Sequence, residues 1–198
     1  MPGGLSDHHL AFPGTVTFSE EIFGGVVTAY VEAFERIGIR DVAVFSAHGG
    51  NLAFLGRYAS AHAAKGSQVR LIAACEFAPY VDAMFDGARR GGVEPPETDV
   101  HAGAVETSQG LSLFPHLVRP VYAEVDGYMA AEEGWFDTLQ TEGLQAISAS
   151  GALGEPPRAK AEAGPPIFDA ITAYLVGWIA AELGYTPAAL VAASGGSR

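Results

Sequence analysis

The predicted fold of this chain depends on one stretch, Val42-Ala43-Val44-Phe45-Ser46-Ala47-His48-Gly49-Gly50-Asn51. The stretch is typical of a short buried strand followed by a histidine, two glycines and an asparagine that can begin a helix. In open α/β sheets, ligands bind beyond the carboxyl ends of the strands. A histidine at that place is a candidate metal ligand or proton carrier. The alternative is a structural histidine held by hydrogen bonds.

Helical and strand patterns alternate on both sides of this stretch and predict an α/β fold. Apolar residues recur at helical spacing over residues 17–38 and again over 51–64, and a second apolar strand covers 69–75. Thr17 and Glu20 fit a capping box at the start of the first helix. Because a helix joins the two strands, we expect a parallel sheet with a right-handed crossover.

The rest of the chain is predicted to complete one domain over residues 1–185, followed by a flexible tail over 186–198. Pro120 is compatible with an edge strand, and Pro165-Pro166 is expected to break the last helix. The further elements expected are helices over 77–88, 102–114 and 158–183 and an edge strand within 118–125.

Composition excludes several classes of protein. The 198 residues include 23 acidic and 11 basic ones, a net charge of −12, which argues against a nucleic-acid partner. A single cysteine, Cys75, excludes an internal disulfide framework, and its apolar neighbours predict a buried side chain. No window reads as long and apolar enough to span a membrane, and the N-terminus lacks the form of a signal peptide. We therefore expect a cytoplasmic protein with no membrane partner.

Two further segments carry residues suited to chemistry. His101 directly precedes a predicted helix and can point into a cleft, and Glu106 lies about one turn into that helix. Asp99 is placed to orient His101 by accepting a proton from its ring. The alternative for Glu106 is a solvated helix face. His8 and His9 precede a Phe-Pro-Gly turn, and adjacent side chains rarely converge on one ion, so His9 is a candidate substrate contact.

Together these motifs resemble the creatininase (creatinine amidohydrolase) family. Each motif alone is weak evidence for the family, but four of them in the same order over residues 4–185 are a specific signature. They are Gly4-Leu5-Ser6-Asp7-His8-His9-Leu10-Ala11-Phe12-Pro13-Gly14-Thr15, Ser46-Ala47-His48-Gly49-Gly50-Asn51, Asp99-Val100-His101-Ala102-Gly103 with Glu106-Thr107-Ser108, and Gly151-Ala152-Leu153-Gly154-Glu155-Pro156.

The resemblance implies a three-layer α/β/α sandwich with a mostly parallel central sheet, often assembled into hexamers or other homo-oligomers. It also implies metal-dependent hydrolysis of a cyclic amide or another C–N amide bond in a small molecule or peptide. Zinc is the expected metal, with manganese and iron as alternatives. The roles that it implies are metal binding by His48 and Glu106, proton transfer by His101, and substrate contact by His9, Gly49, Gly50, Asn51 and Asp99.

Two departures from the family pattern change these expectations. Creatininase has a metal-binding glutamate two residues after the ligand histidine, where this chain has Gly50, so creatinine is not the expected substrate. The family's first segment, a strand ending in Glu-x-His with a later Asp, has no counterpart in residues 1–16. We therefore expect N-terminal strands and several metal ligands to be missing, with an incomplete metal site.

Three explanations remain open for that missing segment. The start codon was assigned too late, the chain is a fragment, or it is a short paralogue that serves as a non-catalytic small-molecule-binding or oligomerisation subunit. We favour the first, because His48, His101 and Glu106 are intact. Catalytic zinc usually takes three protein ligands, so residues 1–198 alone are expected to bind metal weakly and to have little activity.

Overall fold

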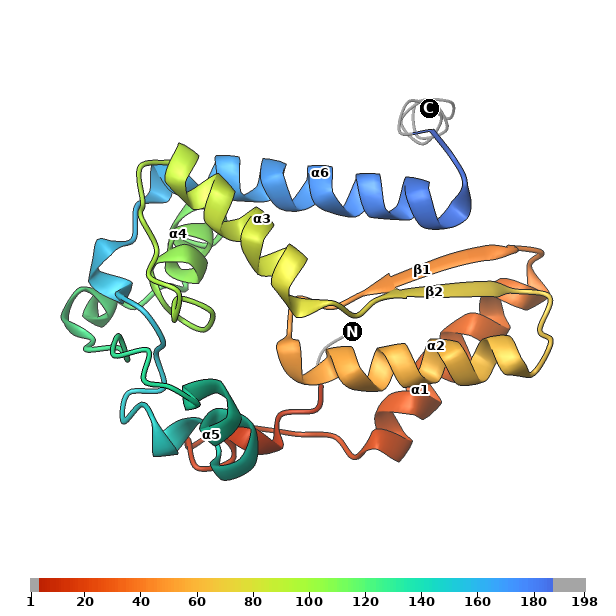
Figure 1. Cartoon of the computed structure of the whole chain (residues 1–198), viewed down its shortest axis with the longest axis horizontal. Helices are drawn as coiled ribbons and strands as arrows, with labels where there is room; N and C mark the ends of the chain where they lie inside the picture. The colour runs from red at the N-terminus through yellow and green to blue at the C-terminus, as the bar shows by residue number, and fades with distance from the viewer. Residues whose placement is uncertain (1–3, 187–198) are drawn as a thin grey trace. The chain divides into compact units, whose positions relative to one another are not determined.

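The computed structural model describes residues 4–186 and confirms an α/β fold (Figure 1). Its strands, β1 and β2, pair in parallel, with Asp41 opposite Arg70 and Phe45 opposite Ala74. Short 3-10 turns lie at Asp7–His9, Gly49–Asn51, Pro120–Glu124, Leu144–Ala146, Pro156–Arg158 and Ala161–Ala163. The helices and strands are α1 (Glu20–Arg36), β1 (Asp41–Phe45), α2 (Leu52–Ala64), β2 (Arg70–Ala74), α3 (Phe77–Arg90), α4 (Ala104–Leu113), α5 (Trp135–Glu142) and α6 (Gly164–Leu183).

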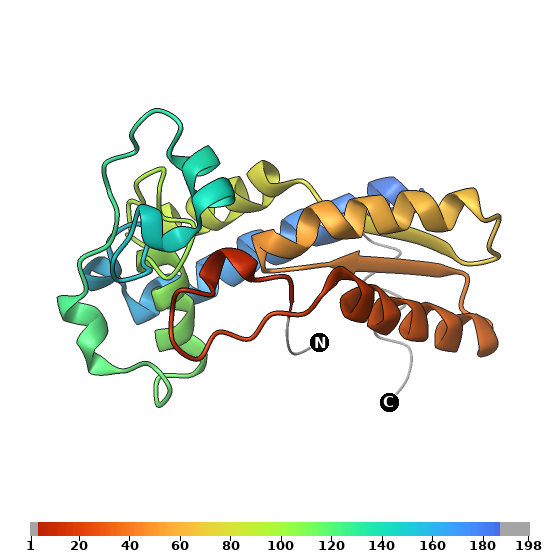
Figure 2. The same ribbon diagram turned by 90° about the horizontal axis from the view of Figure 1, so that it is seen from below.

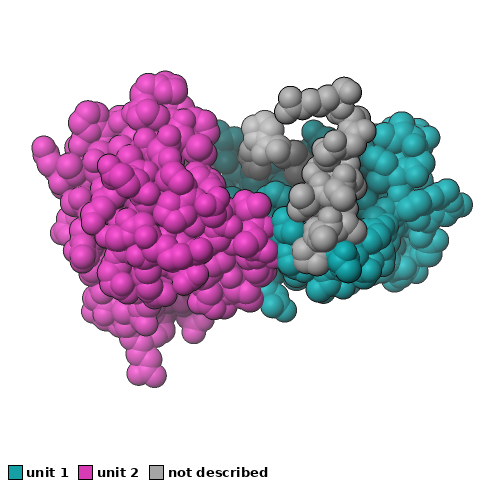
Figure 3. All heavy atoms as spheres, turned by 90° about the horizontal axis from the view of Figure 1, so that it is seen from above, with its two compact units in different colours: residues 1–6, 16–77, 175–198 teal, residues 7–15, 78–174 magenta. Residues whose placement is uncertain are grey.

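The chain forms two compact units, which are coloured separately in Figure 3. Unit 1 contains residues 1–6, 16–77 and 175–198, and unit 2 contains residues 7–15 and 78–174. Both units are assembled from separated segments, so neither corresponds to one continuous stretch of sequence. A single domain over residues 1–185 stays a prediction, and the predicted tail lies, from residue 187 onward, outside the described residues.

The core of unit 1 lies between α1, α2 and the two strands, and Figure 2 shows both helices running alongside the sheet. The ring of Phe23 on α1 packs edge-on against Phe54 on α2, with 5.4 Å between ring centroids. A β-carbon on Gly24 would lie 2.9 Å from the ring of Phe54. The missing side chain at Gly24 therefore permits the close approach of the two helices. The other members of this core include Val27, Val31, Leu55, Val69 and Leu71.

The start of α1 differs from the predicted capping box. Ser19 is the N-cap, and its hydroxyl accepts the backbone N–H of Ile22 at 3.3 Å. Thr17 is used elsewhere, because its hydroxyl accepts the N–H of Ser6 at 2.9 Å. The N-terminal segment is thereby attached to unit 1 just before the chain enters the helix.

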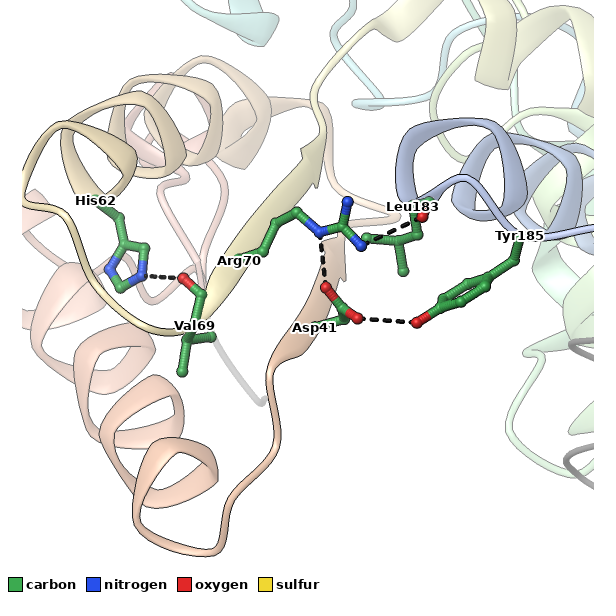
Figure 4. A network of polar contacts seen from close by, with 6 residues as sticks. All are labelled: Asp41, His62, Val69, Arg70, Leu183 and Tyr185. Carbon is green, nitrogen blue, oxygen red and sulfur yellow. Dashed lines mark hydrogen bonds and ion pairs between the residues drawn. The ribbon is translucent and has the colours of Figure 1, made fainter.

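The end of α6 lies against the opposite side of the sheet from α1 and α2 (Figure 1). Arg70 on β2 donates to the carbonyl of Leu183 at 3.2 Å and pairs with Asp41 on β1 at 2.7 Å (Figure 4). The hydroxyl of Tyr185 donates to the second carboxylate oxygen of Asp41 at 3.0 Å. Hydrogen bonds from Arg70 and Tyr185 lower the pKa of Asp41. Unit 1 therefore has helix on both sides of its strands, although Phe45 remains 54% exposed.

The apolar character of α6 corrects one expectation from the sequence. Residues Ala161–Leu183 are long and apolar enough to cross a membrane by length and composition, with a mean hydropathy of 1.3. Only 17% of that window is buried within the structure. A single such helix is weak evidence for a membrane, because core helices of soluble proteins pass the same test. Pro165 and Pro166 lie in its first turn, where proline is tolerated, and do not break the helix.

Two other local predictions were wrong, and one helix was not predicted. The segment Pro120–Glu124 forms a 3-10 turn and no edge strand. Helix α5, Trp135–Glu142, was not predicted, because the helical signal in residues 116–150 is weak. Cys75 is exposed, because β2 ends at Ala74, immediately before it.

Candidate active site

Unit 2 contains a cavity of about 510 Å³ that is lined by three of the predicted functional residues. His9 comes from the N-terminal segment, whereas His101 and Glu106 come from the loop before α4 and from its first turn. These segments are about ninety residues apart in sequence, and folding brings them to one surface. The rest of the wall is mostly apolar, from residues such as Val118, Val121 and Leu144.

The N-terminal turn places His9 beside His101. The backbone carbonyl of His9 accepts the N–H of Phe12 at 2.9 Å and the hydroxyl of Thr15 at 2.9 Å. Phe12 packs near Gly151, where a β-carbon would meet its ring at 3.2 Å. The ring of His9 lies 4.6 Å from that of His101, centroid to centroid, with 32° between their planes. Two imidazoles therefore face the same cavity.

The loop before α4 is held by Glu106. Its Oε2 atom accepts the backbone N–H of Ala102 at 2.6 Å. Ala102 has a φ of 52°, a left-handed conformation that costs a non-glycine residue about 1–3 kcal/mol. Strained backbone of this kind persists where its surroundings fix it, commonly at functional sites. Glu106 thus both lines the cavity and fixes the backbone immediately after His101.

Asp99 also holds this region, through hydrogen bonds to the first turn of α4. Its side chain is 0% exposed, and its carboxylate oxygens accept the backbone N–H groups of Ala104 at 2.9 Å and Val105 at 3.2 Å. It therefore caps α4, because Gly103, at the N-cap position, has no side chain with which to do so. A β-carbon at Gly154 would lie 2.5 Å from the carboxyl carbon of Asp99, so the glycine makes room for it.

Burial raises the pKa of Asp99 to about 6, and Glu106 adds to that rise by charge repulsion. The backbone N–H groups of Val105, Ala104 and Glu155 act in the opposite direction. Asp99 was predicted to accept the ring proton of His101 and to contact substrate. The structure gives its carboxylate the role of a buried helix cap, and Asp99 is not among the residues that line the cavity.

The residues after β1 belong to unit 1, and there His48 is anchored to the N-terminal segment. Its Nε2 atom lies 3.0 Å from the carbonyl oxygen of Leu5 and 3.1 Å from the hydroxyl of Ser6. Because a carbonyl oxygen can only accept, Nε2 carries the proton in this arrangement, and metal binding would fall to Nδ1. The role of His48 as a metal ligand stays a prediction.

The three residues after His48 form the turn that leads into α2. Gly49 and Gly50 lie in the 3-10 turn before α2, and Asn51 is the last, buried residue of that turn. The side-chain oxygen of Asn51 accepts the N–H of Leu5 at 2.9 Å, and its amide nitrogen donates to Ser46 at 3.0 Å. Asn51 therefore ties the N-terminal segment to unit 1, and substrate contact by these three residues remains a prediction.

Sequence reasoning missed several polar residues of the cavity. Arg119, Tyr122 and Ser150 line its wall, and all three lie in the weakly patterned segment 116–150. Tyr80, on α3, has a raised pKa because of burial and, second, the charge of Glu106, which places it near the site. No helical or strand period in segment 116–150 indicated the position of Arg119, Tyr122 and Ser150.

The described residues do not fit a catalytic metal centre by themselves. Within residues 4–186 no three His, Cys, Asp or Glu side chains are arranged to hold a metal ion. Catalytic zinc usually takes three protein ligands. Residues 4–186 therefore supply too few clustered ligands for a catalytic zinc ion.

Comparison with known proteins identifies the family. The family model described as "Creatininase: Creatinine amidohydrolase" matches residues 1–179, which is most of the chain. The chain belongs to the creatininase family. The four motifs noted in the sequence all lie within the matched residues.

Two proteins that are similar in sequence are named as a hydrolase and a peptidase. The chain is 31% identical over 118 residues to "3-dehydro-scyllo-inosose hydrolase" of Thermotoga maritima, a match that covers 59% of this chain and 37% of that protein. It is 29% identical over 167 residues to "Mycofactocin precursor peptide peptidase" of Mycolicibacterium smegmatis, covering 83% of this chain and 58% of that protein. The chain thus spans less than two thirds of the length of both relatives.

Solved structures of creatininase have the same fold. A mutant creatininase of Zn-Zn type superposes with a TM-score of 0.67 at 22% identity, covering 91% of this chain and 72% of that one. A second structure, "creatinine amidohydrolase (creatininase)", gives 0.64 at 23% identity, covering 88% and 68%. At this level of identity the match establishes the creatininase-like fold.

Proposed function

We propose that the cavity of unit 2 is the site of amide hydrolysis, acting on a cyclic amide or another C–N amide bond of a small molecule or peptide. The observation that carries this proposal is the meeting of His9, His101 and Glu106 at one cavity wall. Membership of the family and the names of the two relatives support the reaction class. Creatinine is not favoured, because Gly50 stands where creatininase has a glutamate.

The proposed reaction is hydrolysis of the amide bond, with His101 as the proton donor. Water adds to the carbonyl carbon, the C–N bond breaks, and the products are a carboxylate and an ammonium group. Of the two protons that the water loses, one restores the protonated form of His101 and the other ends on the released amine. His101 donates a proton to the leaving nitrogen, a general-acid step that typically contributes about 10²–10⁴-fold in rate. Glu106 is the acidic group of the site, and His9 contacts the substrate.

Metal dependence is part of the proposal and comes from the family resemblance. Zinc is the first candidate, with manganese and iron as alternatives. A bound metal ion would activate water and polarise the carbonyl group. Because the described residues do not supply three clustered ligands, we expect residues 1–198 to hold such an ion weakly.

The test is a panel of amides assayed with and without added zinc, manganese or iron. Creatinine, formamides, small lactams and short peptides would each be incubated with the protein, and the released amine and carboxylate would be measured by mass spectrometry. We expect slow turnover of at least one non-creatinine amide. Absence of turnover across the panel under every metal condition would count against the proposal.

A second candidate function, a non-catalytic small-molecule-binding or oligomerisation subunit, is favoured by one observation. The ring of His48 already contacts Leu5 and Ser6, so the histidine that the family pattern assigns to metal has other partners. Such a subunit would bind an amide without hydrolysing it. Binding by calorimetry with no product by mass spectrometry would distinguish this function from catalysis.

We also propose that the chain forms homo-oligomers. The family resemblance is the basis of this proposal, and large apolar side chains such as Val16, Ile37 and Leu117 are individually exposed. Light scattering should give a mass above the 20.6 kDa of one chain. A mass equal to one chain over a wide concentration range would refute this proposal.

A further inference from the structure

Within the described residues Arg119 has no carboxylate partner, a property that it shares with Arg36 and Arg40, neither of which lines the cavity. Five arginines form ion pairs within the described residues, at Arg57, Arg70, Arg89, Arg90 and Arg158. The side chain of Arg119 makes no ion pair or hydrogen bond with another described residue. The absence of a partner is notable because acidic residues outnumber basic ones in this chain, 23 to 11. An unpaired guanidinium group is available to an external anion.

The position of Arg119 connects this free cation to the proposed reaction. Arg119 lines the same cavity as His101 and Glu106, and it is the only Lys or Arg among the described residues that do so. Because the cavity has a volume of about 510 Å³, a ligand of modest size that fills it can reach both Arg119 and His101. Its anionic end and its reacting amide would then be held at the same time.

The surroundings of Arg119 select the kind of anion. Val118, Val121 and Val125, from the same segment, give the wall an apolar surface beside the guanidinium group. One arginine suits a carboxylate, which it can hold through two parallel N–H···O bonds. A phosphate with its higher charge is usually held by several donors. Backbone restriction by Pro120 holds residue 119 in extended geometry, with φ −71° and ψ 134°, which limits where its side chain starts.

We propose that Arg119 binds a carboxylate of the substrate, and that the substrate class is therefore amides that carry a carboxylate away from the reacting bond, such as N-acyl amino acids or the C-terminal residues of peptides. This inference rests on the proposed function for its reacting bond, but the binding of the carboxylate can be measured without turnover. The apolar wall accepts the aliphatic or aromatic part of such a ligand.

The experiment uses ligand pairs that differ only in the charged group. N-benzoylglycine is compared with its primary amide, and a short peptide with a free C-terminus is compared with the same peptide amidated. Dissociation constants are measured by calorimetry or ligand-observed NMR for the wild type, Arg119→Gln, Arg119→Lys and Arg90→Gln. Arg90 is the matched control, because it is an exposed arginine of unit 2 that does not line the cavity.

The wild type should bind each carboxylate about 10- to 100-fold more tightly than its neutral partner, as expected for a charge-assisted hydrogen bond. Arg119→Gln should abolish that preference, Arg119→Lys should keep part of it because the charge remains without the planar fork, and Arg90→Gln should leave it unchanged. The pair that shows the larger preference identifies the source of the carboxylate, free acyl amino acid or peptide.

Equal binding of the charged and neutral partners, or a preference that survives Arg119→Gln, would overturn the inference. So would a failure of both carboxylates to bind, or tighter Arg119-dependent binding of benzyl phosphate. Turnover of amides without any carboxylate preference would leave the proposed function standing and reject the role of Arg119. A carboxylate preference without turnover would support the role of Arg119 and count against the proposed hydrolysis.

Discussion

The buried cap Asp99 makes a specific prediction about stability and pH. Its pKa is raised from 3.8 to about 6 in the folded protein, chiefly by burial. Between those two pH values the folded state binds more protons at Asp99 than the unfolded state does. Stability from this residue is therefore greatest at low pH, falls as the pH rises through about 4 to 6, and is constant above about 7.

The magnitude follows from the size of the shift. One pKa unit corresponds to about 1.4 kcal/mol, so a shift from 3.8 to about 6 changes the unfolding free energy by about 3 kcal/mol over this pH range. Asp99→Asn removes the titrating group. It also replaces one acceptor by an amide that donates, which leaves one of the N–H groups of Ala104 and Val105 without a partner and costs about 1–3 kcal/mol.

The assay is urea unfolding of the wild type and Asp99→Asn at several pH values from 4 to 7.5, followed by tryptophan fluorescence. Both proteins would carry Trp178→Phe, so that the signal comes from Trp135. Trp135 packs against the core of Leu139, Leu144 and Leu153 in unit 2, and the N–H of Leu153 bonds to the carbonyl of His101 at 2.8 Å.

The difference between the two proteins is the informative quantity, because the other titrating groups cancel. The advantage of Asp over Asn at position 99 should shrink by about 2 kcal/mol between pH 4 and pH 7, because part of the full change of about 3 kcal/mol already occurs below pH 4. Asp169→Asn is the control for exchanging an aspartate for an asparagine at an exposed position of the same unit. Parallel stability profiles for the wild type and Asp99→Asn would refute the assignment of Asp99 as a buried, titrating cap.

Three further predictions concern packing, an unpaired hydroxyl and metal content. Gly24→Ala should lower the urea midpoint, because the new β-carbon would lie 2.9 Å from the ring of Phe54. Gly25→Ala places its β-carbon in open space and should raise the unfolding free energy by up to about 1 kcal/mol. The opposite order of the two variants would contradict the close packing of α1 and α2. The hydroxyl of Thr98 is buried and has no hydrogen-bond partner among residues 4–186, so Thr98→Val should leave stability unchanged or raise it by up to about 1 kcal/mol in the same assay. A clear loss would reveal a partner for this hydroxyl. Residues 1–198 dialysed against zinc should retain less than one ion per chain by mass spectrometry of the metal, and one or more tightly held ions per chain would show that the ligand set is complete.

The parts of the fold that sequence patterns predicted are those where local and tertiary signals agree. The β1–α2–β2 unit was predicted because its apolar runs match strand and helix periods, and its parallel pairing is confirmed. The boundaries shifted where a tertiary contact competes for a residue. Thr17 was predicted to cap α1, but its hydroxyl binds Ser6, eleven positions away, so Ser19 takes over the cap.

Prediction of the candidate site from sequence was likewise limited to segments with a clear local pattern. Motif spacing identified His9, His101 and Glu106, which do line one cavity, because each lies in a segment with a recognisable local pattern. Arg119 lies where no helical or strand period exists, so its approach to His101 depends on the path of a loop. The capping role of Asp99 was likewise hidden, since it requires the left-handed turn at Ala102 that only the folded loop shows.

The most direct test of amide hydrolysis at this cavity is the specificity constant of His101→Ala for the amide that the wild type hydrolyses fastest. His116→Ala is the matched control, because His116 is an exposed histidine of unit 2 outside the cavity. Loss of the proton donor should lower kcat/KM about 100-fold or more, while the control stays close to the wild type. Equal values for wild type, His101→Ala and His116→Ala would contradict the placement of catalysis at this site.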